Sequence, residues 1–62
     1  MPHIQITMLK GRTIEQKRKI VERVTDAIAE EGKTAKEGVI VTIIEVSRED
    51  YGHGGVLMVD KK

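Results

Sequence analysis

Few side chains in this chain could do chemistry, and the earliest candidate is the proline at its second position. Pro2 follows Met1 in the opening stretch MPHIQITMLKGR. While Met1 is attached, the Pro2 nitrogen is a tertiary amide whose lone pair is delocalised into the carbonyl group. Once Met1 is removed, the same nitrogen is a secondary amine that can take up a proton. Pro2 is therefore a candidate general base.

The remaining candidates are an arginine, a tyrosine and two histidines. The planar guanidinium of Arg12 suits a carboxylate, and Tyr51 is the only aromatic residue. His3 and His53 are the only histidines and no cysteine is present, so we predict no metal site. The sequence also contains no phosphate-binding or dinucleotide-binding glycine motif and no recognisable nucleophile motif. We therefore predict no cofactor.

Each candidate also has a purely structural interpretation. A proline is tolerated as the first residue of a strand, and an arginine in a loop is most often only solvated. Glycines that follow an aromatic residue, as in YGHGG from Tyr51 onward, are typical of a turn. Function must therefore be argued from the combination of these residues and from the elements that position them.

Length and composition predict a single domain, residues 1–62, that associates with copies of itself. A chain of this size buries only about 60% of the surface that its unfolded form exposes. With no cysteine, no disulfide can add stability. We therefore expect a homo-oligomer.

The charge balance argues against nucleic acid and membranes as partners. Eleven basic and ten acidic residues leave a net charge of +1, which gives no general attraction to phosphate backbones or acidic lipids. No stretch approaches the roughly 20 apolar residues of a membrane span, and the opening residues lack the apolar run of a secretory signal. We expect a cytoplasmic protein.

Hydrophobic patterning predicts a strand over residues 2–9, followed by a helix. Along the strand, Ile4, Ile6 and Met8 alternate with His3, Gln5 and Thr7, which indicates one buried face. Thr13 and Gln16 have the form of a capping box. One stripe of the helix is apolar: Ile20, Val21, Val24, Ala27 and Ile28. We expect an ion pair between Glu15 and Lys19, and a left-handed Gly32 as the end of the helix.

A second strand is predicted over residues 39–46, where VIVTIIEV is apolar on both faces. Val39, Val41 and Ile43 can pack under the helix, which leaves Ile40, Thr42 and Ile44 for another subunit to cover. Strand, helix and strand give a right-handed βαβ unit with a parallel pair. The glycines after Tyr51 predict a turn, followed by a short edge strand or hairpin. The fold class is α+β.

Taken together, these features resemble the 4-oxalocrotonate tautomerase family. The resemblance rests on Pro2, the alternating strand, GRT and EQK at the start of the helix, the βαβ order and YGHGG after the second strand. It covers residues 2–59. It implies a βαβ protomer assembled into hexamers, as a trimer of dimers, with active sites that draw residues from neighbouring subunits.

The resemblance also implies a role for individual residues. Pro2 matches the catalytic base, which moves a proton in a 2-hydroxydienoate or an enol-pyruvate type acid, and Arg12 matches the arginine that binds the substrate carboxylate. Leu9, Ile40 and Tyr51 would form the apolar wall of the substrate site. Ile40 departs from the family, because it stands where the family carries a second arginine. The hydroxyl of Tyr51 is a candidate donor to a developing enolate oxygen.

Other functions stay open at this point. A secondary amine also forms iminium ions with aldehydes, so a lyase or hydratase of the same superfamily is one alternative. Ile40 favours another, a non-catalytic or partner subunit of a mixed hexamer. A nucleic-acid-binding module is disfavoured, because acidic residues interrupt the basic stretch QKRKIVER.

Overall fold

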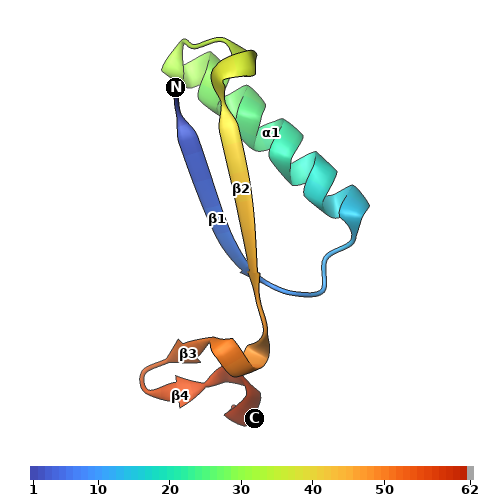
Figure 1. The fold of residues 1–62 in the computed structure, drawn as a ribbon, viewed down its shortest axis with the longest axis vertical. Helices are drawn as coiled ribbons and strands as arrows, with labels where there is room; N and C mark the ends of the chain where they lie inside the picture. The colour runs from blue at the N-terminus through green and yellow to red at the C-terminus, as the bar shows by residue number, and fades with distance from the viewer. Residues whose placement is uncertain (62) are drawn as a thin grey trace.

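The structure is a computed structural model that describes residues 1–61. Strand β1 (His3–Leu9) leads to helix α1 (Ile14–Gly32), which is followed by β2 (Ile40–Val46) and a short hairpin of β3 (Gly52–His53) and β4 (Val56–Leu57). As Figure 1 shows, α1 lies along one side of the β1–β2 pair, and the hairpin lies beyond the end of the pair opposite to the amino terminus. The predicted βαβ unit with a parallel strand pair is confirmed, and so is the hairpin.

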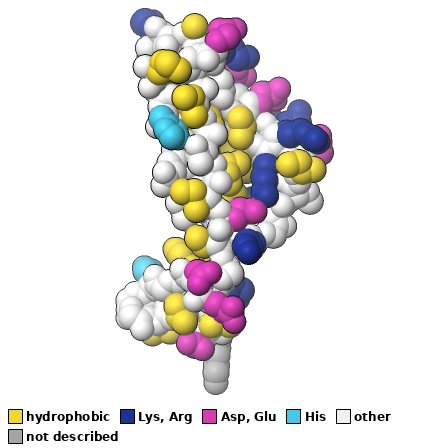
Figure 2. All heavy atoms as spheres, viewed as in Figure 1, with side chains coloured by type: hydrophobic (Ala, Val, Ile, Leu, Met, Phe, Trp, Pro, Cys, Tyr) yellow, Lys and Arg dark blue, Asp and Glu magenta, His cyan; other side chains and the backbone are white. Residues whose placement is uncertain are grey.

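The register of the two strands decides which residues share a face. His3 pairs with Ile40, Gln5 with Thr42 and Thr7 with Ile44. Because side chains alternate along a strand, these six residues share one face of the sheet, and all six are exposed. We call them the uncovered face. Figure 2 shows hydrophobic side chains along the strands among polar ones.

Helix α1 covers the opposite face. Ile4, Ile6 and Met8 of β1 and Val41 and Ile43 of β2 are half-buried there, as the alternation predicts. Lys17 of α1 reaches across to Glu45 of β2, with Nζ 2.8 Å from Oε1. Within residues 1–61 no side chain is fully buried. One helix on two strands therefore does not enclose a core.

The start of α1 forms as predicted. The hydroxyl of Thr13 accepts a hydrogen bond from the Gln16 amide at 3.1 Å, and the Gln16 side chain accepts one from the Thr13 amide at 2.8 Å. These bonds satisfy two amide groups that have no partner within the helix. The capping box therefore fixes where the loop that carries Arg12 ends.

Three details of α1 differ from expectation. The left-handed residue is Lys33 (φ 52°, ψ 52°), because the helix continues through Gly32 until the Lys33 amide bonds to the Ala29 carbonyl. Ala27 is exposed, on the edge of the apolar stripe. Glu15 pairs with Arg18 at 2.6 Å rather than with Lys19, since residues three apart on a helix are neighbours just as residues four apart are.

Glycine conformations shape the two tight turns. Gly11, with φ of 129°, follows β1 in the loop to α1, and Gly54 and Gly55 have φ of 62° and 86° between the hairpin strands. Positive φ at both central residues is what a two-residue hairpin loop of type I′ requires. The glycines of YGHGG thus serve the turn that the sequence predicts.

Candidate active site

Pro2 and Ile40 lie together at one end of the sheet, which we call the Pro2 end. Pro2 is half-buried and directly precedes β1. Its carbonyl accepts a hydrogen bond from the Ile40 amide at 3.0 Å. The Ile40 side chain, 44% exposed, belongs to the uncovered face. The base candidate and one predicted wall residue are therefore neighbours.

Lys36 and Asp26 form an ion pair, and Lys36 shortly precedes Ile40 in the sequence. The Lys36 ammonium lies 2.9 Å from the Asp26 carboxylate, which joins the turn before β2 to α1. The hydrogen bond and the charge of Asp26 raise the pKa of Lys36 above its ordinary value of 10.5. Lys36 therefore stays charged around neutral pH, and the pair joins the segment that leads into Ile40 to the helix.

Arg12 lies at the opposite end of β1, in the loop before α1. Its guanidinium donates a hydrogen bond to the Leu9 carbonyl at 3.3 Å. It also borders a hollow of about 390 Å³, whose other lining residues are Glu15, Gln16, Lys19 and Ile20. Within the described part of the chain, Arg12 has no ion pair. Arg12 is thus a cation available to an anionic ligand.

Tyr51 lies at the same end as Arg12. Its carbonyl accepts a hydrogen bond from the Met58 amide at 2.8 Å, which extends the pairing of the hairpin by one residue on each side. The side chain lines a cavity of about 160 Å³ together with Thr7, Met8, Leu9, Val46 and Met58. Leu9 therefore contributes both to this cavity and to the bond that holds Arg12. We call Leu9, Arg12 and Tyr51 the Arg12 end.

One protomer does not bring the five predicted site residues together. The Pro2 end and the Arg12 end are separated by the length of β1, about 23 Å for seven residue steps at about 3.3 Å each. Figure 1 shows the two ends at opposite extremes of the strand pair. A small acid cannot touch Pro2 and Arg12 of the same chain at once. Each protomer therefore carries the predicted site residues in two separate groups, which we call half-sites.

Sequence reasoning missed some residues at both ends. The alternation pattern could have placed Thr7 and Met8 near the end of β1, but nothing in the pattern indicates that Met58 returns to the Tyr51 cavity. The sequence places His3 on the polar face of the first strand but gives it no partner, whereas in the structure its ring nitrogen Nε2 is hydrogen-bonded to the hydroxyl of Thr42 at 2.9 Å. That hydrogen bond could be predicted only if the register of the two strands were known.

Residues 1–61 contain neither a cluster of metal-binding side chains nor a membrane-spanning helix. No three histidine, cysteine or acidic side chains there gather as a metal ion would require. No helix in this range is long and apolar enough to cross a membrane.

The whole chain is similar to known tautomerases. The family model described as tautomerase enzyme matches residues 2–61. The 2-hydroxymuconate tautomerase of Bacillus subtilis (strain 168) is 40% identical over 60 residues, which are 97% of each chain.

Solved structures agree with this match. The structure of YwhB, a homologue of 4-oxalocrotonate tautomerase, has a TM-score of 0.95 at 38% identity and covers 98% of this chain and 100% of its own. A heterohexameric 4-oxalocrotonate tautomerase from Chloroflexus aurantiacus has a TM-score of 0.93 at 31% identity, with both chains fully covered.

Proposed function

The chain belongs to the tautomerase enzyme family, and we propose that it moves a proton within 2-hydroxydienoate or enol-pyruvate type acids, with Pro2 as the general base. It is an enzyme of the 4-oxalocrotonate tautomerase type. The observation that carries the proposal is the position of Pro2, directly ahead of β1, in a chain that matches the family from residue 2 onward. No cofactor takes part in the proposed reaction.

The proposed base is the amine that Pro2 carries after Met1 has been removed. A base is most effective when its pKa lies near the working pH. A nearby cation and an apolar environment both disfavour the protonated amine and lower its pKa. Arg12 would supply the cation. Each unit by which the pKa of the Pro2 amine is lowered corresponds to about 1.36 kcal/mol of interaction free energy.

Arg12 is proposed to bind the substrate carboxylate. Two parallel N–H groups of its guanidinium can donate to the two carboxylate oxygens. Its freedom from any ion pair within residues 1–61 supports this role. Leu9, Ile40 and Tyr51 would line the rest of the site and exclude water.

The proposed active site is shared between copies of the chain. The separation of the Pro2 end from the Arg12 end supports this arrangement, because a small acid must reach both. The exposed apolar residues of the uncovered face, Ile40 at 44% and Ile44 at 39%, offer a surface on which copies can pack. We propose a homohexamer, built as a trimer of dimers. Its substrate is a small carboxylate, and nucleic acid and membranes are not among its partners.

Ile40 bears on the choice of substrate. A side chain without charge at this position cannot polarise a second carboxylate or a keto group. We therefore propose that acids with one carboxylate are better substrates than dicarboxylates. The same residue favours one alternative, a subunit that acts beside a different chain, and the similarity to a heterohexameric tautomerase supports this alternative.

Removal of Met1 provides the direct test. We expect a preparation shown by intact mass to begin at Pro2 to be active on a panel of enol acids, and one that retains Met1 to be inactive. In the active form, kcat/KM should rise with pH as the amine loses its proton, with a midpoint below that of an ordinary exposed amine. Full activity in a wholly Met1-retaining preparation would exclude Pro2 as the base.

A further inference from the structure

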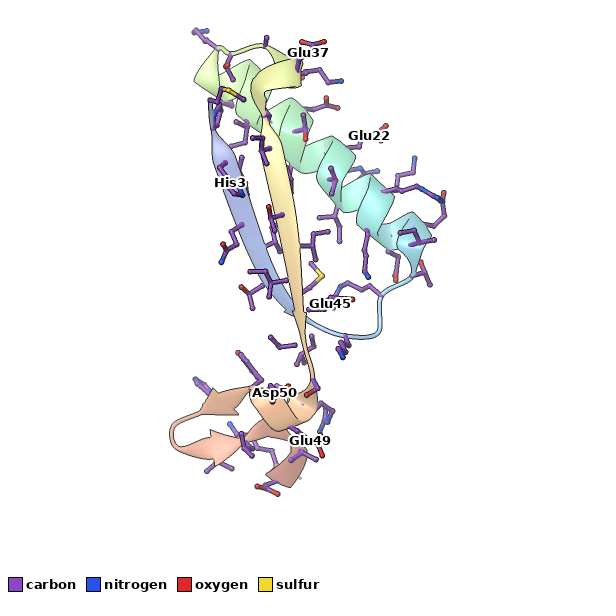
Figure 3. All side chains as sticks on the ribbon, in the orientation of Figure 1. His3, Glu22, Glu37, Glu45, Glu49 and Asp50 are labelled. Carbon is purple, nitrogen blue, oxygen red and sulfur yellow. The ribbon has the colours of Figure 1, made fainter. Side chains whose placement is uncertain are left out.

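His3 and Thr42 form a polar contact between the two strands near the Pro2 end. The imidazole Nε2 of His3 lies 2.9 Å from the Thr42 hydroxyl oxygen, and Figure 3 labels His3 on β1. Thr42 pairs in register with Gln5, so the His3 ring reaches diagonally across the sheet. Within residues 1–61 this is the one hydrogen bond between side chains of β1 and β2.

Little else holds Pro2 in place. The first paired residues of the ladder are His3 and Ile40, and beyond them only the bond from the Ile40 amide to the Pro2 carbonyl, at 3.0 Å, reaches the proline. The first residues of a domain are poorly ordered unless they are tied down. Without the His3 contact, the strand would fray at its first backbone hydrogen bond, which joins the Ile40 amide to the Pro2 carbonyl.

We propose that His3 and Thr42 are positioning residues for Pro2: their hydrogen bond fixes the start of β1 and so holds the Pro2 nitrogen in its reactive position. This inference rests on the proposed role of Pro2 as the base. Catalytic groups must be held to within about 0.5 Å of the productive geometry, which a fraying first residue cannot satisfy.

The contact acts on the base and not on the group that binds the carboxylate. Both side chains belong to the uncovered face at the Pro2 end, whereas the proposed carboxylate contact in a shared site is Arg12 of another copy. Loss of the contact should therefore lower kcat and leave KM nearly unchanged. If copies of the chain cover this face, the bond lies away from water, and its loss costs more free energy than it would at an exposed position.

The test compares three substitutions in the processed enzyme. Thr42→Val removes the hydroxyl, Thr42→Ser keeps it, and Gln5→Met removes an amide group of the same face that makes no hydrogen bond within residues 1–61. We expect Thr42→Val to lower kcat about fivefold, the factor that corresponds to about 1 kcal/mol. Thr42→Ser and Gln5→Met should stay within about twofold of the parent, because neither breaks the bond.

A second measurement does not depend on activity. Exchange of the Ile40 amide proton reports how often the Pro2–Ile40 bond opens. Thr42→Val should accelerate this exchange about fivefold, in step with the loss of one hydrogen bond, while Gln5→Met should not. His3→Leu breaks the same bond from the other strand, so the double variant should be no worse than either single variant. The single variant His3→Leu also keeps the proposal testable if Thr42→Val does not assemble.

The outcomes separate this inference from the proposed function. Unchanged Ile40 exchange and unchanged kcat in both Thr42→Val and His3→Leu would overturn the positioning role. An equal loss in Gln5→Met would also overturn it, because general damage to the face would then explain the effect. Faster exchange with unchanged kcat, in an enzyme that still needs a free Pro2, would mean that the bond holds the strand but not the base. Faster exchange in an enzyme that does not need Pro2 would contradict the proposed function instead.

Discussion

A mixture of two defective chains tests the shared active site most directly. One chain begins at Pro2 and is acetylated on the proline nitrogen, so that it has no amine. The other has a free Pro2 and carries Arg12→Ala. Each alone should be nearly inactive, because the first lacks the base and the second lacks the carboxylate-binding group. The chain of 62 residues is short enough to be made by chemical synthesis.

The expected recovery follows from the geometry. Since β1 places Pro2 about 23 Å from Leu9, whose carbonyl bonds to Arg12, a complete site must take Pro2 and Arg12 from different copies. When equal amounts assemble at random, each required residue is intact with a chance of one half, so about a quarter of the sites are complete. A site formed within one chain would give no complete sites at all.

The assay is joint denaturation, refolding and measurement of kcat per chain. Parent enzyme carried through the same steps sets the reference, and mixing the two chains without denaturation controls for slow exchange of subunits. Mass spectrometry establishes that mixed oligomers have formed. If such oligomers show only the average activity of the two starting chains, while the parent recovers fully, the reasoning from the separation of the half-sites is refuted.

Three further predictions concern single residues. Arg12→Ala should lower kcat/KM for carboxylate substrates by at least about tenfold, or roughly 1.4 kcal/mol. Arg12→Lys should not restore kcat/KM, because an ammonium lacks the planar fork of a guanidinium. Steady-state kinetics that match the parent would show that another cation binds the carboxylate. Ile44→Asp should give smaller or unfolded species by sedimentation, since an unpaired charge buried between copies costs several kcal/mol; an unchanged oligomer mass and melting temperature would contradict the proposed interface. Ile40→Arg should raise activity on a dicarboxylate relative to a monocarboxylate in paired assays. Fast turnover of the dicarboxylate by the parent would instead indicate that another hydrogen-bond donor already polarises the substrate, and the hydroxyl of Tyr51 is the first donor to test.

Local sequence signals predicted the fold well, because each element depends on neighbours in the chain. The capping box at Thr13 and Gln16 requires only residues three apart, and it forms with both hydrogen bonds. The turn at Gly54 and Gly55 likewise depends on local backbone freedom. The end of α1 was harder to place, because a left-handed Lys33 costs only about 1–2 kcal/mol and a single bond to the Ala29 carbonyl can decide between adjacent residues.

The candidate site was less predictable, because its geometry depends on distance along a strand and on register. Residue types alone could single out Pro2 and Arg12, and the resemblance could assign their roles, but only the strand between them shows that one chain holds them far apart. The His3–Thr42 bond needed the parallel register, in which Thr42 lies opposite Gln5. The ion pair of Glu15 depended on a choice between Arg18 and Lys19 that spacing leaves open.

The lack of a core and the division of the site have one common consequence. Within residues 1–61 no side chain is fully buried, so a single protomer gains little from the hydrophobic effect that stabilises folded chains. The same protomer holds only half of each proposed site at either end of β1. Association would therefore bury the uncovered face and complete the active site in one step. Stability and activity would then share one dependence on protein concentration, because whatever binds only the folded chain stabilises it by mass action.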